Sequence, residues 1–161
     1  MPHTIVIFGA SGDLTSRKLV PALYNLMRAG SLPPATRILG FSRTPMTDDA
    51  WRTSLRETTS QHAGGEPFSE TAWQEFAATL TYQQGDIASA ADFESLKQRL
   101  TAIEGDGSAT RVYYLATAPQ FYAPIVRALG AIGMATETNG PRRIVVEKPF
   151  GTDLSTARTL N

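Results

Sequence analysis

Several residue types are missing or scarce in this chain of 161 residues, and each absence excludes a class of protein. There is no cysteine, so disulfides, thiolate nucleophiles and cysteine-based metal sites are excluded. Only two histidines occur, His3 and His62, and we therefore expect no metal site. The apolar runs are far shorter than the ~18 residues of a membrane span. Met1 leads almost directly into a predicted strand without a signal peptide, so we expect a soluble, cytoplasmic protein with no membrane partner.

An excess of charge is also lacking. Fifteen basic residues balance fifteen acidic ones, which gives no reason to expect a nucleic-acid partner. Hydrophobic residues make up 42% of the chain and charged residues 19%, a composition typical of a globular protein. The length suits one domain with a sizeable core. Lysine is rare among the basic residues, so each of the three lysines is a candidate for a specific role: Lys18, Lys97 and Lys148.

Predicted strands and helices alternate along the chain. The strands are expected at residues 4–8, 37–41, 81–84, 112–116 and 142–146. The helices are expected at residues 14–29, from a cap at Thr47 to about residue 60, and at 69–80, 90–103 and 118–129. Pro21 inside the first helix predicts a kink or two abutting helices. The alternation predicts an α/β fold: a doubly wound, Rossmann-like, mostly parallel sheet with helices on both faces, in a single domain over residues 1–161.

A glycine-rich turn, Gly9-Ala10-Ser11-Gly12, joins the first strand to the first helix, which is the layout of a dinucleotide site. Gly9 permits a sharp turn and Gly12 lets the backbone approach a pyrophosphate. The helix N-terminus adds N–H groups and a partial positive charge. The coenzyme is therefore expected to lie against residues 9–16, which are Gly9, Ala10, Ser11, Gly12, Asp13, Leu14, Thr15 and Ser16. The G-x-x-G spacing also suits an ordinary turn, and Asp13, which would repel phosphate, is expected to cap the helix.

The end of the second predicted strand distinguishes between two coenzymes. An NAD site places an acidic residue there to bind the ribose 2′-OH. No acidic residue occurs between Arg37 and Met46, and Arg43 stands there between Ser42 and Thr44. A guanidinium can bind a 2′-phosphate through two hydrogen bonds and can stack on adenine. Arg43 therefore predicts NADP as the coenzyme, with an exposed surface arginine as the alternative.

The ends of the third and fourth predicted strands supply further candidates. Asp86 and Ile87 are expected beside the adenine, although Asp86 suits a cap of the next turn equally well. Ala116 and Thr117 are small enough to leave room for the nicotinamide ribose. Tyr122, one turn into the next helix, is expected to reach the same crevice or to pack in the core.

Lys148 follows the fifth predicted strand, in Glu147-Lys148-Pro149. Ligands of open α/β sheets bind at the carboxyl ends of the strands. An ammonium group there suits a sugar hydroxyl or phosphate, so Lys148 is expected to contact both substrate and coenzyme. The alternative is a surface ion pair between Glu147 and Lys148.

Four motifs in the same order resemble the coenzyme domain of the glucose-6-phosphate dehydrogenase family. They are FGASGDLTSRKLVPALYNL at 8–26, GFSR at 40–43, YLATAP at 114–119 and RRIVVEKPFGTDL at 142–154. Thr15 stands where the family usually has alanine. The resemblance implies NADP as coenzyme, glucose 6-phosphate as the small-molecule substrate, 6-phosphogluconolactone as product and a place in the pentose phosphate pathway.

The resemblance also implies that the chain is truncated after its NADP-binding domain. Family members continue with a segment of the type R-I-D-H-Y-L-G-K, a His–Asp pair that takes the C1-hydroxyl proton, and an antiparallel sheet for dimerisation. We therefore expect no catalytic base in this chain. His3 precedes the first predicted strand, at the amino edge of the sheet, and His62 lies in a predicted loop far from the site. The resemblance implies a monomeric chain that binds NADP without activity, and a full-length homodimer or tetramer.

Three other classes of protein would predict different properties for this chain. A sugar oxidoreductase domain of the Gfo/Idh/MocA type also carries an E-K-P turn, and an NADP-sensing module would bind coenzyme without chemistry. A short-chain reductase would need Tyr-x-x-x-Lys. Leu14, Phe93 and Ile144 stand four residues before the three lysines, which excludes it.

Overall fold

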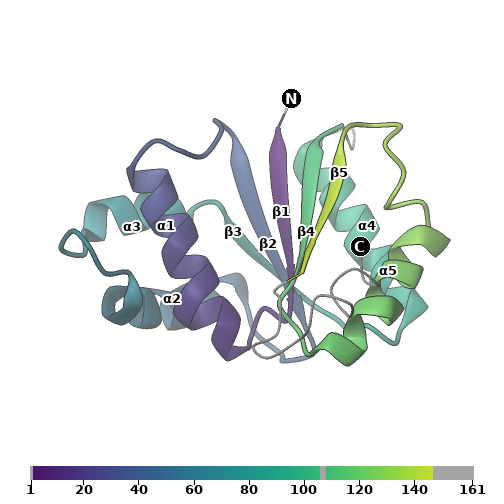
Figure 1. Ribbon diagram of the computed structural model, residues 1–161, viewed down its shortest axis with the longest axis horizontal. Coiled ribbons are helices and arrows are strands. Elements are labelled where there is room, and N and C mark those ends of the chain that lie inside the picture. The colour runs from purple at the N-terminus through teal and green to yellow at the C-terminus, as the bar shows by residue number, and fades with distance from the viewer. Residues whose placement is uncertain (1, 106–107, 147–161) are drawn as a thin grey trace, which may run out of the picture.

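Five parallel strands form one sheet in the order β3-β2-β1-β4-β5 (Figure 1). The computed structural model describes residues 2–105 and 108–146. The strands are β1 (His3–Phe8), β2 (Thr36–Ser42), β3 (Leu80–Gln84), β4 (Thr110–Leu115) and β5 (Arg142–Val146). The β2-β1-β4 centre of the sheet is where the strand order reverses, and ligands of such sheets bind at the carboxyl ends of these strands.

Helices cover both faces of the sheet, as the alternating pattern predicted (Figure 1). One face carries η1 (Thr15–Leu19), α1 (Val20–Arg28), α2 (Asp48–His62) and α3 (Glu70–Ala77). The other carries α4 (Ala90–Glu104), η2 (Pro119–Phe121) and α5 (Tyr122–Ala131). Because β1 is buried on both sides, Ile7 belongs to the first core and Val6 and Phe8 belong to the second.

The first helix changes its winding where the sequence predicted an interruption. The segment η1 is a π-helix, in which the Val20 N–H donates to the Thr15 carbonyl. The α-helix α1 follows, with Pro21 in its first turn. Proline has no N–H and its ring crowds the preceding turn, so a widened turn just before it is the expected response.

The boundaries differ from the predicted ones mainly at the third helix. That helix was expected to run to Leu80 but ends at Ala77, and Leu80 begins β3 beside Ile38. Thr79 ends the helix, because both its N–H and its hydroxyl donate to the Phe76 carbonyl, at 3.0 and 2.7 Å. In the last helix the first turn is the separate segment η2, so α5 begins four residues after the predicted start. The other limits lie within two residues of the predicted ones, and β5 matches them.

Candidate functional site

A cavity of about 600 Å³ lies at the carboxyl edge of the sheet, where β1, β2, β3 and β4 end. Its size is that of a ligand site. Four stretches of chain line it, one following each strand: Gly9, Ser11 and Gly12; Phe41, Ser42, Arg43 and Thr44; Gly85, Asp86, Ile87 and Ala88; and Ala116, Thr117, Ala118, Phe121 and Pro124. Eight of the residues predicted for the coenzyme are among them, brought together from segments up to 108 positions apart in the chain (9 to 117).

The turn after β1 requires glycine at its first position. Gly9 has a φ of +88°, a conformation that L-residues with side chains rarely adopt. A Cβ there would lie 2.4 Å from the Ala116 carbonyl oxygen. The turn is held by the Gly9 N–H, which donates to Phe41 O at 3.0 Å, and by the Thr15 hydroxyl, which donates to Gly9 O at 2.9 Å. The sharp turn predicted at Gly9 is confirmed.

Gly12 is a glycine for a different reason. A Cβ at this position would meet a single non-neighbouring atom within 4 Å, Gly9 O at 3.4 Å, which is an ordinary contact. The fold of the described residues therefore does not demand glycine here. Gly12 lines the cavity, so a larger side chain at this position would lie at the cavity wall. The helix begins beside it, with the Ser16 N–H bonded to Gly12 O at 3.2 Å, so the partial positive charge of its N-terminus faces the cavity.

Arg43 is the positive charge of this cavity. Its side chain is exposed, and none of the ion pairs found among the described residues involves it. An unpaired guanidinium at a cavity wall can accept an anion without first breaking an existing bond. The loop that carries Arg43 is joined to the glycine turn, since the Thr44 hydroxyl donates to Ser11 Oγ at 3.1 Å.

The remaining walls come from the turns after β3 and β4. Asp86 Oδ1 accepts the Ala88 N–H at 2.8 Å, so Asp86 forms the turn that was its alternative role, and it also lines the cavity. Ile87 stands beside it. Ala116 and Thr117 form the opposite wall with small side chains.

Several predicted site residues lie away from the cavity wall. Ala10 and Thr15 are buried beneath the turn, Leu14 packs on the core, and Ser16 donates back to Asp13 O. The expected helix cap by Asp13 is wrong. No side chain caps the start of η1, and the exposed Asp13 carboxylate instead lies 4.0 Å from Arg17 Nε, one turn along the helix.

Two residues predicted for the site remain, Tyr122 and Lys148. Tyr122 is 3% exposed and packs in the second core with Ile125 and Leu129, which was its alternative role, and it does not line the cavity. Phe121 of η2 and Pro124 of α5 line the cavity. Lys148 lies outside the described residues.

The sequence interpretation missed eight residues of the wall: Phe41, Ser42, Thr44, Gly85, Ala88, Ala118, Phe121 and Pro124. Six of them adjoin a predicted residue, so extending each predicted stretch by one position would have found Ser42, Thr44, Gly85, Ala88, Ala118 and Phe121. Phe41 and Pro124 adjoin no predicted residue, because Phe41 lies inside β2 and Pro124 lies inside α5.

The glycine turn is supported from beneath by a buried tryptophan. Trp51 of α2 donates from Nε1 to Ala10 O at 3.1 Å. Its ring fits over β2 because Gly40 has no side chain. A Cβ on Gly40 would lie 2.6 Å from the ring and 2.7 Å from Ala10 Cβ. The position of the turn therefore depends on the packing of α2 against β2.

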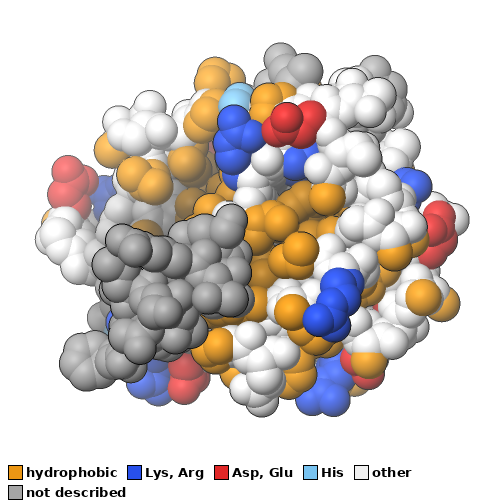
Figure 2. Space-filling model, turned by 45° about the vertical axis from the view of Figure 1, so that its right-hand side comes forward, with side chains coloured by type: hydrophobic (Ala, Val, Ile, Leu, Met, Phe, Trp, Pro, Cys, Tyr) orange, Lys and Arg blue, Asp and Glu red, His pale blue; other side chains and the backbone are white. Residues whose placement is uncertain are grey.

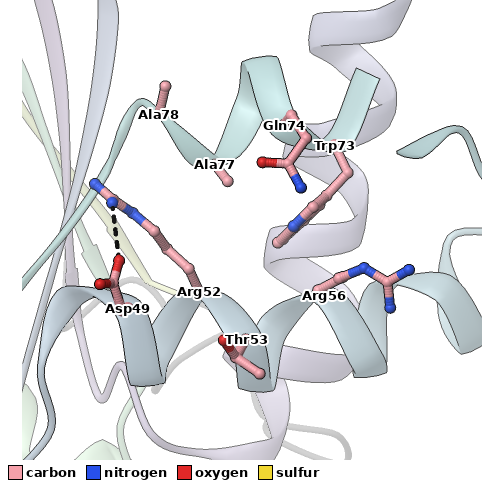
Figure 3. A pocket seen from close by; sticks show the side chains of 8 residues that line it. All are labelled: Asp49, Arg52, Thr53, Arg56, Trp73, Gln74, Ala77 and Ala78. Carbon is pink, nitrogen blue, oxygen red and sulfur yellow. Dashed lines mark ion pairs between the residues drawn. The ribbon is translucent and has the colours of Figure 1, made fainter. Parts of the chain in front are cut away.

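A second cavity, of about 370 Å³, lies between α2 and α3 (Figure 3). Its two arginines are already engaged. Arg52 donates to Leu80 O at 3.0 and 2.6 Å, and Arg56 forms a bidentate pair with Glu70. Arg52 is also paired with Asp49 at 3.5 Å, so each arginine of the lining already has a carboxylate partner and the lining offers no unpaired charge to a ligand.

Two other features are absent from residues 2–105 and 108–146. No cluster of three metal-ligating side chains is present there. No helix in that part of the chain has the length and apolar character to cross a membrane.

The strand order, the glycine turn and the cavity at the carboxyl edge together define a dinucleotide-binding domain of the doubly wound class. The family model described as glucose-6-phosphate dehydrogenase, NAD binding domain, matches residues 6–161, and the chain belongs to this family. This membership favours the resemblance found in the sequence over the Gfo/Idh/MocA type.

Known relatives are similar over nearly the whole chain. A glucose-6-phosphate 1-dehydrogenase of Mycolicibacterium smegmatis is 38% identical over 161 residues, which are 99% of this chain and 32% of that protein. One of Aggregatibacter actinomycetemcomitans is 40% identical over 98% of this chain and 32% of its own length. A solved glucose-6-phosphate dehydrogenase in complex with its substrate glucose-6-phosphate has a TM-score of 0.81 and 31% identity, over 98% of this chain and 32% of that one. The chain thus spans about a third of these relatives.

Proposed function

We propose that this chain is the NADP-binding domain of a glucose-6-phosphate 1-dehydrogenase. The observation that carries the coenzyme assignment is Arg43, an unpaired guanidinium at the cavity wall after β2, where an NAD site would have a carboxylate. The family description supports a nicotinamide dinucleotide in general. The choice of NADP is our inference from Arg43.

The residues of the cavity fit such a coenzyme. Gly9 shapes the turn, and Ser11 and Gly12 present hydroxyl and backbone to its phosphates. Arg43 holds the 2′-phosphate, and Asp86 with Ile87 borders the adenine. Ala116 and Thr117 leave room for the nicotinamide ribose. The buried residues Ala10 and Thr15 and the half-buried Leu14 lie away from the cavity wall, and we assign them to holding the turn in place. When bound, the nicotinamide ring accepts a hydride.

The substrate side of the reaction is proposed from the relatives. Their names state the oxidation of glucose 6-phosphate, and the solved structure holds that sugar phosphate. We place Lys148 at the substrate, and the base for the C1-hydroxyl proton in the two thirds of the relatives that this chain does not span. The chain by itself is then a cytoplasmic NADP-binding monomer without dehydrogenase activity, and the full-length enzyme is a dimer or tetramer.

Titration of the purified chain with NADP and NAD, each with and without glucose 6-phosphate, tests this proposal. We expect NADP to bind more tightly than NAD, no effect of the sugar phosphate, and no reduction of NADP at high protein concentration. Failure to bind either dinucleotide would refute the coenzyme assignment. Turnover that disappears in Lys148→Ala would show that a complete active site exists in these 161 residues.

A further inference from the structure

Tyr82 places a hydroxyl against the loop that carries Arg43, although Tyr82 itself does not line the cavity. It lies on β3, is 3% exposed, and its ring packs against Trp51 at a centroid distance of 5.5 Å. Its backbone N–H donates to Asp48 Oδ1 at 2.7 Å. The tyrosine is therefore fixed at both ends of the residue, and its hydroxyl is a rigid point on the neighbouring strand.

The hydroxyl bonds to the residues on either side of Arg43. Tyr82 Oη lies 2.5 Å from the Thr44 carbonyl oxygen and forms a short hydrogen bond with Ser42 Oγ. A carbonyl oxygen only accepts, so the single phenolic proton goes to Thr44 O. Ser42 must then donate its own proton to Tyr82 Oη. The donor and acceptor of both hydrogen bonds follow from the number of protons available. The Tyr82 hydroxyl therefore joins the two residues that flank Arg43.

Two further hydrogen bonds hold the same loop. Gln84 Nε2, also on β3, donates to Arg43 O at 3.3 Å, and the Thr44 hydroxyl donates to Ser11 Oγ in the glycine turn. The loop from Ser42 to Thr44 is thus held by its backbone and its serine, while the Arg43 side chain makes no ion pair within the described residues. Such an arrangement fixes where the guanidinium starts and reduces the conformational freedom that is lost when it binds an anion.

We propose that Tyr82 is a positioning residue for coenzyme selection, whose hydroxyl holds the Ser42–Thr44 loop so that Arg43 meets the 2′-phosphate of NADP. This inference rests on the proposed function. It concerns the preference between the two coenzymes, because NAD has no 2′-phosphate and gains little from an ordered Arg43.

The test is the binding of NADP and NAD to the 161-residue chain with Tyr82→Phe, measured by calorimetric titration. Loss of the hydroxyl is expected to weaken NADP about ten-fold, the upper end of the effect of one hydrogen bond, and NAD less than about two-fold. In an Arg43→Ala background, Tyr82→Phe is expected to have no further effect on NADP, because the hydroxyl acts through that arginine.

Tyr24→Phe is the matched control. Tyr24 is also a buried tyrosine whose hydroxyl bonds to backbone, accepting the Ser69 N–H at 3.1 Å, but it lies on α1 away from the cavity. We expect this variant to lower stability and to leave the ratio of NADP to NAD affinity unchanged. An equal change of that ratio in both variants would mean that Tyr82 has only a structural role.

The outcomes separate this inference from the function on which it rests. A wild-type chain that prefers NADP, with the same preference in Tyr82→Phe, overturns the inference alone. A wild-type chain without any preference overturns both. If Tyr82→Phe does not fold, Ser42→Ala removes the second partner of the hydroxyl and is expected to lower the preference about three-fold, as one neutral hydrogen bond would. An unchanged preference in that variant refutes the proposal.

Discussion

Gly9 and Gly12 stand three residues apart in one turn, and the structure separates their roles. Gly9 is required by the protein itself, through its positive φ and its approach to Ala116 O. Gly12 has room for a Cβ and faces the cavity. The sequence pattern shows both as glycines of a G-x-x-G turn and cannot distinguish them, because the distinction depends on what β4 places beside Gly9.

Substitutions at these glycines should therefore have opposite effects. Gly12→Val is expected to keep the circular dichroism and melting temperature and to abolish NADP binding. Gly9→Ala is expected to destabilise the fold by about 2–4 kcal/mol, through the strained φ and the clash with Ala116 O. Thermal unfolding and NADP titration of both variants check this. Wild-type affinity in Gly12→Val would remove the phosphate role of the turn.

Arg43→Ala tests the charge at the cavity wall. Loss of a charged, bidentate contact costs about 1.5–3 kcal/mol, so NADP should bind about ten- to a hundred-fold more weakly. NAD should be affected far less. The melting temperature should not change, because no ion pair within the described residues depends on Arg43. Equal weakening of both coenzymes would show that Arg43 does not contact the 2′-phosphate.

Among the elements, those with local signals were predicted well. Thr47 caps α2 through a bond from the Ala50 N–H at 3.0 Å, and Ser69 caps α3 in the same way. Pro21 marked the change from η1 to α1. The errors lie where tertiary contacts decide. Leu80 continues the apolar pattern of the predicted helix, but it pairs with β2 in the sheet. Tyr122 is a residue type that often contacts ligands, but it packs in the second core.

The strand β4 carries a buried polar network that predicts sensitivity to alkali. Tyr113 donates to Met134 O at 2.6 Å and accepts from Arg111, which is paired with Glu104. Burial raises the pKa of the Tyr113 phenol above its ordinary value, against the opposing effect of Arg111. The unfolded chain thus loses this proton at a lower pH than the folded chain does. The folded state binds more protons in that window, so stability falls as pH rises.

We therefore expect the urea midpoint to drop between pH 8 and about pH 10.5, the range in which an unfolded tyrosine ionises. Tyr113→Phe, which cannot ionise, should be less stable at pH 8 but should lose less of its stability over this range. Parallel decreases in the two proteins would mean that Tyr113 does not contribute to the alkaline loss.

For the whole molecule, the surface near the β5 edge is notably apolar. Figure 2 shows hydrophobic side chains gathered in the middle of one face. Large apolar residues that are exposed include Ile144 and Val145 of β5, at 41% and 38%, and Phe121 and Val126 near the start of α5. Within the described residues β5 pairs on one side only, with β4. An apolar strand at the edge of a sheet can pair with another chain.

The isolated chain is therefore expected to lose solubility as its concentration rises. Val145→Lys should raise the solubility limit without changing NADP affinity, because a lysine on an edge strand opposes pairing between molecules. Light scattering across a concentration series, with NADP titration of both proteins, checks this. Equal scattering from the variant and the wild-type chain would place the self-association elsewhere.

The two proposed halves of the coenzyme site are formed by different stretches of the chain, and this has an evolutionary consequence. We assign the stretches after β2 and β3, residues 41–44 and 85–88, to the adenosine half of the proposed coenzyme, and the stretch after β4, residues 116–124, to its nicotinamide half. A lineage that exchanged one coenzyme for the other would need to alter only the first set, leaving the site of hydride transfer intact. Changes that select the coenzyme and changes beside the nicotinamide would then fall on different stretches of the gene.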